Sequence, residues 1–124
     1  MIYLDTHVAV WLYLGDLSKF SENAKRAINQ YDLKISPVVV LELTYLFEIG
    51  RLRTEADIML NFLNEAVGLE ICNASFQEIV RSAVRQTWTR DPFDRLIAGH
   101  AAFQNTGLLT KDEVIRRNYL LSVW

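Results

Sequence analysis

Residues 2–6 read Ile-Tyr-Leu-Asp-Thr, a short apolar run that stops at an acidic residue followed by a hydroxyl residue. Other short apolar runs occur along the chain, each too short to form a helix: residues 33–35, 69–72, 108–110 and 119–124. The second run passes into Ser36-Pro37, and the third and fourth are entered through glycines. Such bounded runs are typical of buried strands. The sequence therefore predicts five strands.

The segments between these runs carry helix signals. Ser36-Pro37 and Asp91-Pro92 each read as an N-cap followed by proline at the first helical position. Patterns that resemble capping boxes begin at three hydroxyl residues: Thr54, Ser75 and Thr110. Glycines stand where helices are expected to end: Gly15, Gly50 and Gly68. Strands that alternate with helices predict an α/β fold, with a mainly parallel five-stranded sheet between two helical layers.

The composition is that of one globular domain covering residues 1–124. Hydrophobic residues make up 51% and charged residues 23%, which argues against disorder. The single cysteine, Cys72, excludes an internal disulfide, and no apolar stretch reaches the length of a membrane span. The first residues are apolar but lack a basic leader, so we expect a soluble cytoplasmic protein.

The charge is unevenly distributed. A formal net charge of −2 gives no general attraction to nucleic acid. Residues 81–117, however, hold seven basic groups against four acidic ones. This local excess is open to two interpretations, a phosphate-facing surface or ordinary solvated helix faces.

Asp5 directly follows the first predicted strand, with no Lys or Arg before Lys19. Ligands of open parallel sheets bind beyond the carboxyl ends of the strands, so Asp5 is a candidate site residue. Aspartate is also a favoured N-cap, and Asp5 has that alternative role at the helix expected from Thr6.

Glu42 lies in a predicted helix that is apolar nearly all the way round, which suggests a buried position. A buried unpaired carboxylate costs several kcal/mol, so Glu42 requires a partner, a raised pKa or a metal ion. The alternatives are an arginine from elsewhere in the fold and a metal site.

Two more carboxylates lie in the sequence Asp91-Pro-Phe-Asp-Arg95. Asp91 reads as an N-cap and is mainly structural. Asp94 falls at the third helical position, where backbone N–H groups and the helix dipole stabilise a carboxylate. This capping pattern explains Asp91 well but Asp94 only in part. Arg95 is able to pair with either carboxylate or with a phosphate.

Asp112 follows the fourth predicted strand. With Thr110 as cap, Asp112 is expected in the first helical turn, again near a strand's carboxyl end. Carboxylates that converge without matching cations repel one another, and a hard cation such as Mg²⁺ or Mn²⁺ resolves the repulsion. His7, His100 and Cys72 lack zinc-site spacing. We expect His100 to be a packing residue, whereas His7 is either a surface residue or a neighbour of the site.

Four segments together resemble PIN-domain ribonucleases, in particular the VapC toxins of bacterial and archaeal toxin–antitoxin pairs. They are Met-Ile-Tyr-Leu-Asp-Thr-His (1–7), Ser-Pro-Val-Val-Val-Leu-Glu-Leu (36–43), Arg-Asp-Pro-Phe-Asp-Arg-Leu-Ile-Ala (90–98) and Gly-Leu-Leu-Thr-Lys-Asp (107–112). The resemblance covers essentially the whole chain. The third segment is its most specific element.

The resemblance implies a site and a chemistry. The family's acidic metal-binding and catalytic positions match Asp5, Glu42, Asp94 and Asp112, with Asp5 and Asp94 the first choice as direct ligands. Supporting positions match Asp91, Thr6 and Thr110. The implied fold is a five-stranded parallel sheet between helices, and the implied activity is Mg²⁺- or Mn²⁺-dependent endoribonuclease cleavage by metal-activated water.

The resemblance also implies three partners: an RNA substrate, a cognate antitoxin and a second copy of the chain. Residues 37–49 and 54–66 are rich in large apolar side chains, which predicts an exposed apolar patch and a homodimer. Two alternatives remain open. One is a PIN-like interaction module without nuclease activity, and the other is a receiver-like phosphoacceptor domain, to which Thr110-Lys111 has a superficial likeness.

Overall fold

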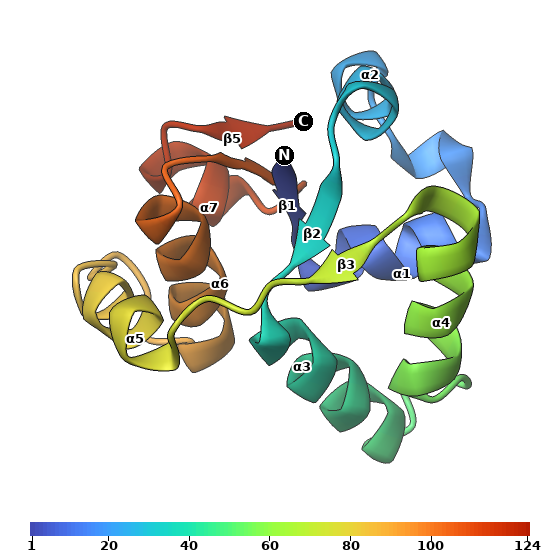
Figure 1. The fold of residues 1–124 in the computed structure, drawn as a ribbon, viewed down its shortest axis with the longest axis horizontal. Coiled ribbons are helices and arrows are strands. Elements are labelled where there is room, and N and C mark those ends of the chain that lie inside the picture. The colour runs from blue at the N-terminus through green and yellow to red at the C-terminus, as the bar shows by residue number, and fades with distance from the viewer.

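A computed structural model describes residues 1–124 as an alternation of strands and helices (Figure 1). The strands are β1 (Ile2–Leu4), β2 (Leu33–Ile35), β3 (Glu70–Ile71), β4 (Gly107–Leu109) and β5 (Ser122–Val123). The helices are α1 (Thr6–Leu14), α2 (Glu22–Gln30), α3 (Pro37–Glu48), α4 (Ala56–Val67), α5 (Phe76–Val84), α6 (Pro92–Phe103) and α7 (Glu113–Asn118), with a 3₁₀ turn at Leu17–Lys19.

All four strand pairs of the sheet are parallel, in the order β3-β2-β1-β4-β5. This confirms the predicted fold class. It also removes the receiver-like alternative, because receiver domains have the flavodoxin-like order 2-1-3-4-5. The first two predicted strands match in extent, whereas the last is shorter than predicted. Its first residue, Tyr119, instead ends α7 by donating its backbone N–H to the Ile115 carbonyl oxygen (2.8 Å).

The helices form two layers around the sheet. In Figure 1, α5, α6 and α7 lie on one side and α1 and α4 on the other, with α3 beyond the end of β2. The helices α5 and α6 pack closely because Gly99 has no side chain: a Cβ there would come within 2.7 Å of the Ala83 backbone. This contact sets the position of α6, which carries Asp94.

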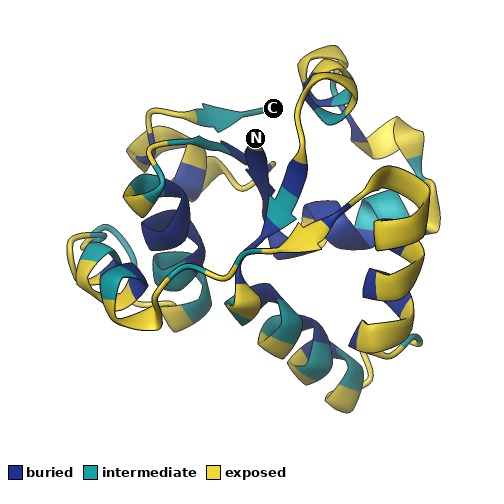
Figure 2. Ribbon diagram, in the orientation of Figure 1, coloured by how far each residue is buried: buried dark blue, intermediate teal, exposed yellow.

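The core lies on the central strands, where Figure 2 shows continuous burial on β1 and the inner face of α6. Tyr3, Leu4 and Leu109 are almost completely buried. His100 is fully buried beside Tyr3. The Tyr3 hydroxyl is hydrogen-bonded to the Nε2 atom of His100 (3.1 Å). Burial lowers the pKa of His100 to about 4, so the ring is neutral at pH 7. The packing role expected of His100 is therefore confirmed.

The predicted burial of α3 is wrong for half of the helix. Val39, Leu43 and Leu46 are buried, but Leu41 is 61% exposed and Tyr45 is 47% exposed. The buried face of α3 packs against α1, α4 and α6, whereas Leu41 and Tyr45 leave the opposite face partly exposed.

The helix ends follow the predictions in part. Gly15 and Gly68 end α1 and α4 in the left-handed conformation, as expected. Two predicted capping boxes do not form, because α4 begins after Glu55 rather than Thr54 and the Ser75 side chain makes no capping hydrogen bond. No helix combines the length and hydropathy needed to span a bilayer.

Candidate metal centre

A cleft of about 520 Å³ lies at the carboxyl ends of β1 and β4, where α1 and α7 begin and α3 and α6 approach. All five carboxylates singled out in the sequence line it. Its lining residues are Asp5, His7, Trp11, Glu42, Asp91, Asp94, Lys111 and Asp112. Parallel strands place their carboxyl ends at one edge of the sheet, which explains why residues that follow β1 and β4 meet here.

Asp5 is the most rigidly held of these carboxylates. It is 6% exposed, its Oδ1 atom accepts the Thr6 backbone N–H (2.8 Å), and its Oδ2 atom accepts the Thr110 hydroxyl (2.7 Å). Asp5 therefore caps α1 and lines the cleft at once, so its two alternative roles are both present. Burial raises its pKa, while the Thr110 and Thr6 hydrogen bonds oppose the shift.

Asp112 occupies a different helical position from the one predicted. It is itself the N-cap of α7, and its Oδ1 atom accepts the backbone N–H groups of Val114 (2.8 Å) and Ile115 (2.9 Å). The Thr110 hydroxyl is not a helix cap because it donates to Asp5 and accepts the Asp112 backbone N–H (3.0 Å). The Oδ2 atom of Asp112 has no hydrogen-bond partner within the chain.

Asp91 is the N-cap of α6, as predicted, and accepts the Asp94 backbone N–H (3.1 Å). Asp94 points into the cleft instead of capping. Burial raises the pKa of Asp94 to about 7, and neighbouring carboxylates add to the effect, in decreasing order Asp91, Asp5, Asp112 and Glu42. These mutual effects show that the carboxylates share one electrostatic environment.

Glu42 faces the same cleft from the middle of α3. Burial raises its pKa, the nearby Thr6 hydroxyl opposes the shift, and the charge of Asp5 adds to it. The Thr6 hydroxyl is fully buried, and no donor or acceptor lies within hydrogen-bonding distance and angle of it. The chain's three salt bridges all lie elsewhere, so the arginine partner considered for Glu42 is absent.

The sequence matches the PIN domain family model over residues 2–120. The chain belongs to the PIN domain family. No curated protein matches it.

The solved structures that resemble this PIN domain include two VapBC complexes. One is VapBC2 from Rickettsia felis bound to a DNA fragment from their promoter, with 22% identity, a TM-score of 0.67 and all of both chains covered. The other is DNA-bound VapBC from Salmonella typhimurium, with 21% identity, a TM-score of 0.61, and 94% of this chain and 91% of that chain covered. At these identities the likeness shows a shared fold.

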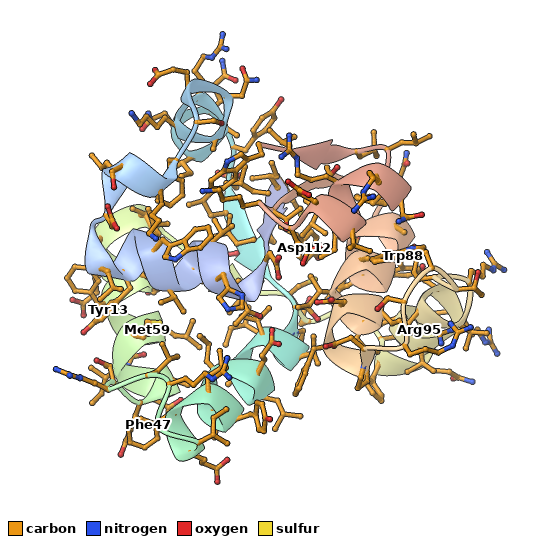
Figure 3. The ribbon with its side chains drawn as sticks, turned by 180° about the vertical axis from the view of Figure 1, so that it is seen from behind. Tyr13, Phe47, Met59, Trp88, Arg95 and Asp112 are labelled. Carbon is orange, nitrogen blue, oxygen red and sulfur yellow. The ribbon has the colours of Figure 1, made fainter.

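Arg95, a predicted supporting residue, does not line the cleft of the PIN domain. Its guanidinium donates to the carbonyl oxygens of Ala83 (3.3 Å) and Val84 (3.0 Å) at the end of α5, and Figure 3 shows it beside that helix. Carbonyl groups at a helix end lack intrahelical partners, so they attract a cation. Of the partners considered for Arg95, neither carboxylate is bound, and the guanidinium instead contacts the end of α5.

Sequence reasoning missed Trp11 and gave Lys111 no role in the site. Trp11 follows His7 by four residues in α1, so both side chains lie on one helix face, and both line the cleft. The four-residue spacing in the sequence is a signal that predicts Trp11 beside His7 on the same helix face. Lys111 lies between Thr110 and Asp112, and its position over the Trp11 ring depends on the fold.

The donor set has the chemistry of a hard divalent cation: carboxylate oxygens, an unpartnered buried hydroxyl at Thr6, and carboxyl groups whose repulsion raises the pKa of Asp94. No three His, Cys, Asp or Glu side chains are arranged as a ready ligand set. The residues therefore fit an ion bound through one or two carboxylates and its own waters, which is the usual mode of Mg²⁺.

Proposed function

We propose that this PIN domain is an Mg²⁺- or Mn²⁺-dependent endoribonuclease, and that it is the toxin of a toxin–antitoxin pair. One observation carries the enzymatic part: Asp5, Glu42, Asp94 and Asp112, from four different elements, line one cleft without an ion-pair partner. Such a concentration of carboxylates is costly for the fold unless a cation offsets it.

We assign the carboxylates different roles according to their hydrogen bonds and positions. Asp5 and Asp94 would hold the cation, with Asp5 kept in one orientation by the Thr110 hydroxyl. Glu42 and the free Oδ2 atom of Asp112 would orient water. A bound cation supplies a polarised phosphoryl oxygen and a water of lowered pKa.

Lys111 is the cation of this chain best placed to neutralise the phosphate charge, because it lines the same cleft.

The test is cleavage of single-stranded RNA by the purified protein. We expect cleavage with Mg²⁺ or Mn²⁺, none with EDTA, and recovery when the ion is restored. Asp94→Asn should reduce cleavage to background, whereas Glu65→Gln, which removes an exposed carboxylate from α4, should leave it unchanged. Cleavage that persists in excess chelator contradicts the proposal. A folded protein without cleavage under any divalent ion would instead be a PIN-like interaction module.

The toxin assignment draws on the likeness to the two VapBC structures. An antitoxin segment that reaches the cleft would present Arg or Lys to the carboxylates and replace the cation by charge compensation. We further propose a cytoplasmic location, a homodimer, and a cognate antitoxin encoded beside this chain. Co-expression of the neighbouring small reading frame should give a stable complex that lacks ribonuclease activity.

A further inference from the structure

Three aromatic side chains cluster beside the acidic cleft. Trp11 contacts Trp124 edge to face, with ring centroids 5.9 Å apart. Phe20 packs against Trp124 at 5.5 Å and against Trp11 at 6.5 Å. Both indoles are only partly buried, and Trp11 lines the cleft itself.

Two lysines accompany this cluster. The Nζ atom of Lys111 lies 5.8 Å from the Trp11 ring centroid and 5.9 Å from that of Trp124. The Nζ atom of Lys19 lies 5.7 Å from the Trp11 centroid. Neither lysine forms a salt bridge with a carboxylate. Partly exposed aromatic rings with adjacent cations that lack a carboxylate partner are a combination by which proteins bind single-stranded nucleic acid.

A second hollow of about 780 Å³ is lined in part by Trp124. It is lined by Arg116 and Arg117 of α7, with Glu113 as its one acidic residue. Both arginines are exposed and form no salt bridge. Trp124 lines this hollow, Trp11 and Lys111 line the acidic cleft, and Trp124 contacts both of them, so the hollow and the cleft are neighbours.

The sheet explains this adjacency. Asp5 follows β1, Lys111 comes shortly after β4, and Trp124 follows β5. These three strands are neighbours in one parallel sheet, so the residues after them share an edge. Strand order therefore places Trp124 beside Lys111 at the edge where Asp5 lies.

We propose that Trp11, Trp124 and Lys111 form a base-stacking subsite for a single-stranded nucleotide next to the acidic cleft, and that Arg116 and Arg117 bind the adjoining phosphates. The proposal rests on the proposed ribonuclease function and names how its substrate is held. A base stacks on an indole, and the ammonium of Lys111 neutralises the linking phosphate. The reacting phosphate then lies over the carboxylates.

The test measures binding without cleavage, in EDTA. The Trp88→Phe variant keeps only Trp11 and Trp124 as fluorescent indoles, and is titrated with hexaadenylate and with an abasic oligomer of equal length and charge. We expect hexaadenylate to quench the indoles and to bind about 10-fold more tightly than the abasic oligomer. Equal binding of the two oligomers, or no quenching, overturns the proposal, and it does so without any variant of the subsite.

Two variants sharpen the result. Trp124→Leu keeps an apolar contact with Phe20 but lacks a stacking face, so it should lose about 10-fold in affinity for hexaadenylate and almost none for the abasic oligomer. Arg116→Ala with Arg117→Ala should lower the salt dependence of binding, whereas Arg51→Ala with Arg53→Ala, the same charge change at an exposed loop, should not. Competition by hexaglutamate as strong as by hexaadenylate would mark a general anion-binding surface and overturn the proposal.

The cleavage assay separates this inference from the proposed function. Base-dependent quenching by a protein that never cleaves RNA supports the subsite and refutes the nuclease. RNA cleavage that is unaffected by Trp124→Leu, with equal binding of both oligomers, supports the nuclease and refutes the subsite.

Discussion

Asp94 has a strongly raised pKa. Its pKa is raised to about 7, from an ordinary value of 3.8, first by burial and then by the carboxylates around it. Between these two pH values the folded protein holds a proton that the unfolded chain has released. Because the folded state binds more protons, the contribution of Asp94 to the stability of the metal-free protein is fully present below pH 4 and is lost as the pH rises toward 7.

The Asp94→Asn substitution should remove most of this pH-dependent loss of unfolding free energy. The neighbouring carboxylates titrate together with Asp94, so we expect the variant to be more stable than the wild type at pH 8 by on the order of 1–2 kcal/mol. Urea unfolding at pH 5 and pH 8 in EDTA measures the difference, with Glu65→Gln as control. A large loss of stability in Asp94→Asn at both pH values would instead identify Asp94 as a structural residue of α6.

At the scale of the element, the first turn of α6 carries two carboxylates with different roles: Asp91 caps the helix and Asp94 does not. Asp91 accepts the Asp94 backbone N–H, and Asp94 is left to face the cleft. Further along the helix, the close contact of Gly99 with Ala83 holds α6 against α5.

The two carboxylates should therefore respond differently to truncation. Asp91→Ala should cost about 0.5–2 kcal/mol of stability because it removes the cap, and should leave most activity where the protein is folded. Asp91→Ser should restore the stability, since serine also caps. Asp94→Ala should abolish RNA cleavage with the fold intact. Thermal melts and cleavage rates measured on all three variants check this, and the reverse pattern would exchange the two roles.

At the scale of the whole molecule, one face of α3 exposes large apolar side chains. Leu41, Tyr45 and Ile49 are each close to half exposed or more, and Tyr45 stacks with Phe93 at 6.0 Å. A continuous apolar patch is typical of an interface.

We expect a homodimer that buries this face. Light scattering after size exclusion should give twice the chain mass, and Leu41→Glu should give a monomer because a buried unpaired charge is costly. Phe76→Glu, at a similarly exposed apolar position on α5, should remain dimeric. A wild-type monomer at high micromolar concentration would refute the dimer.

Local sequence patterns were sufficient to predict the fold class and to single out the carboxylates that line the cleft. Strand ends, proline and capping residues are read within a few positions, so β1, β2 and the Asp91 cap are predictable from their own segments. Parallel strand ends then imply that Asp5 and Asp112 meet at one edge.

Tertiary structure decided what depends on contacts distant in sequence. The bond from Thr110 to Asp5 joins residues 105 positions apart, and it makes Asp112 rather than Thr110 the cap of α7. Packing on α5 turned Arg95 away from the cleft, and no local pattern predicts that Trp11 and Trp124 meet. The physical reason is that capping and strand signals are short-range, whereas the partner of a hydroxyl, a guanidinium or an indole is chosen by which elements the sheet brings together.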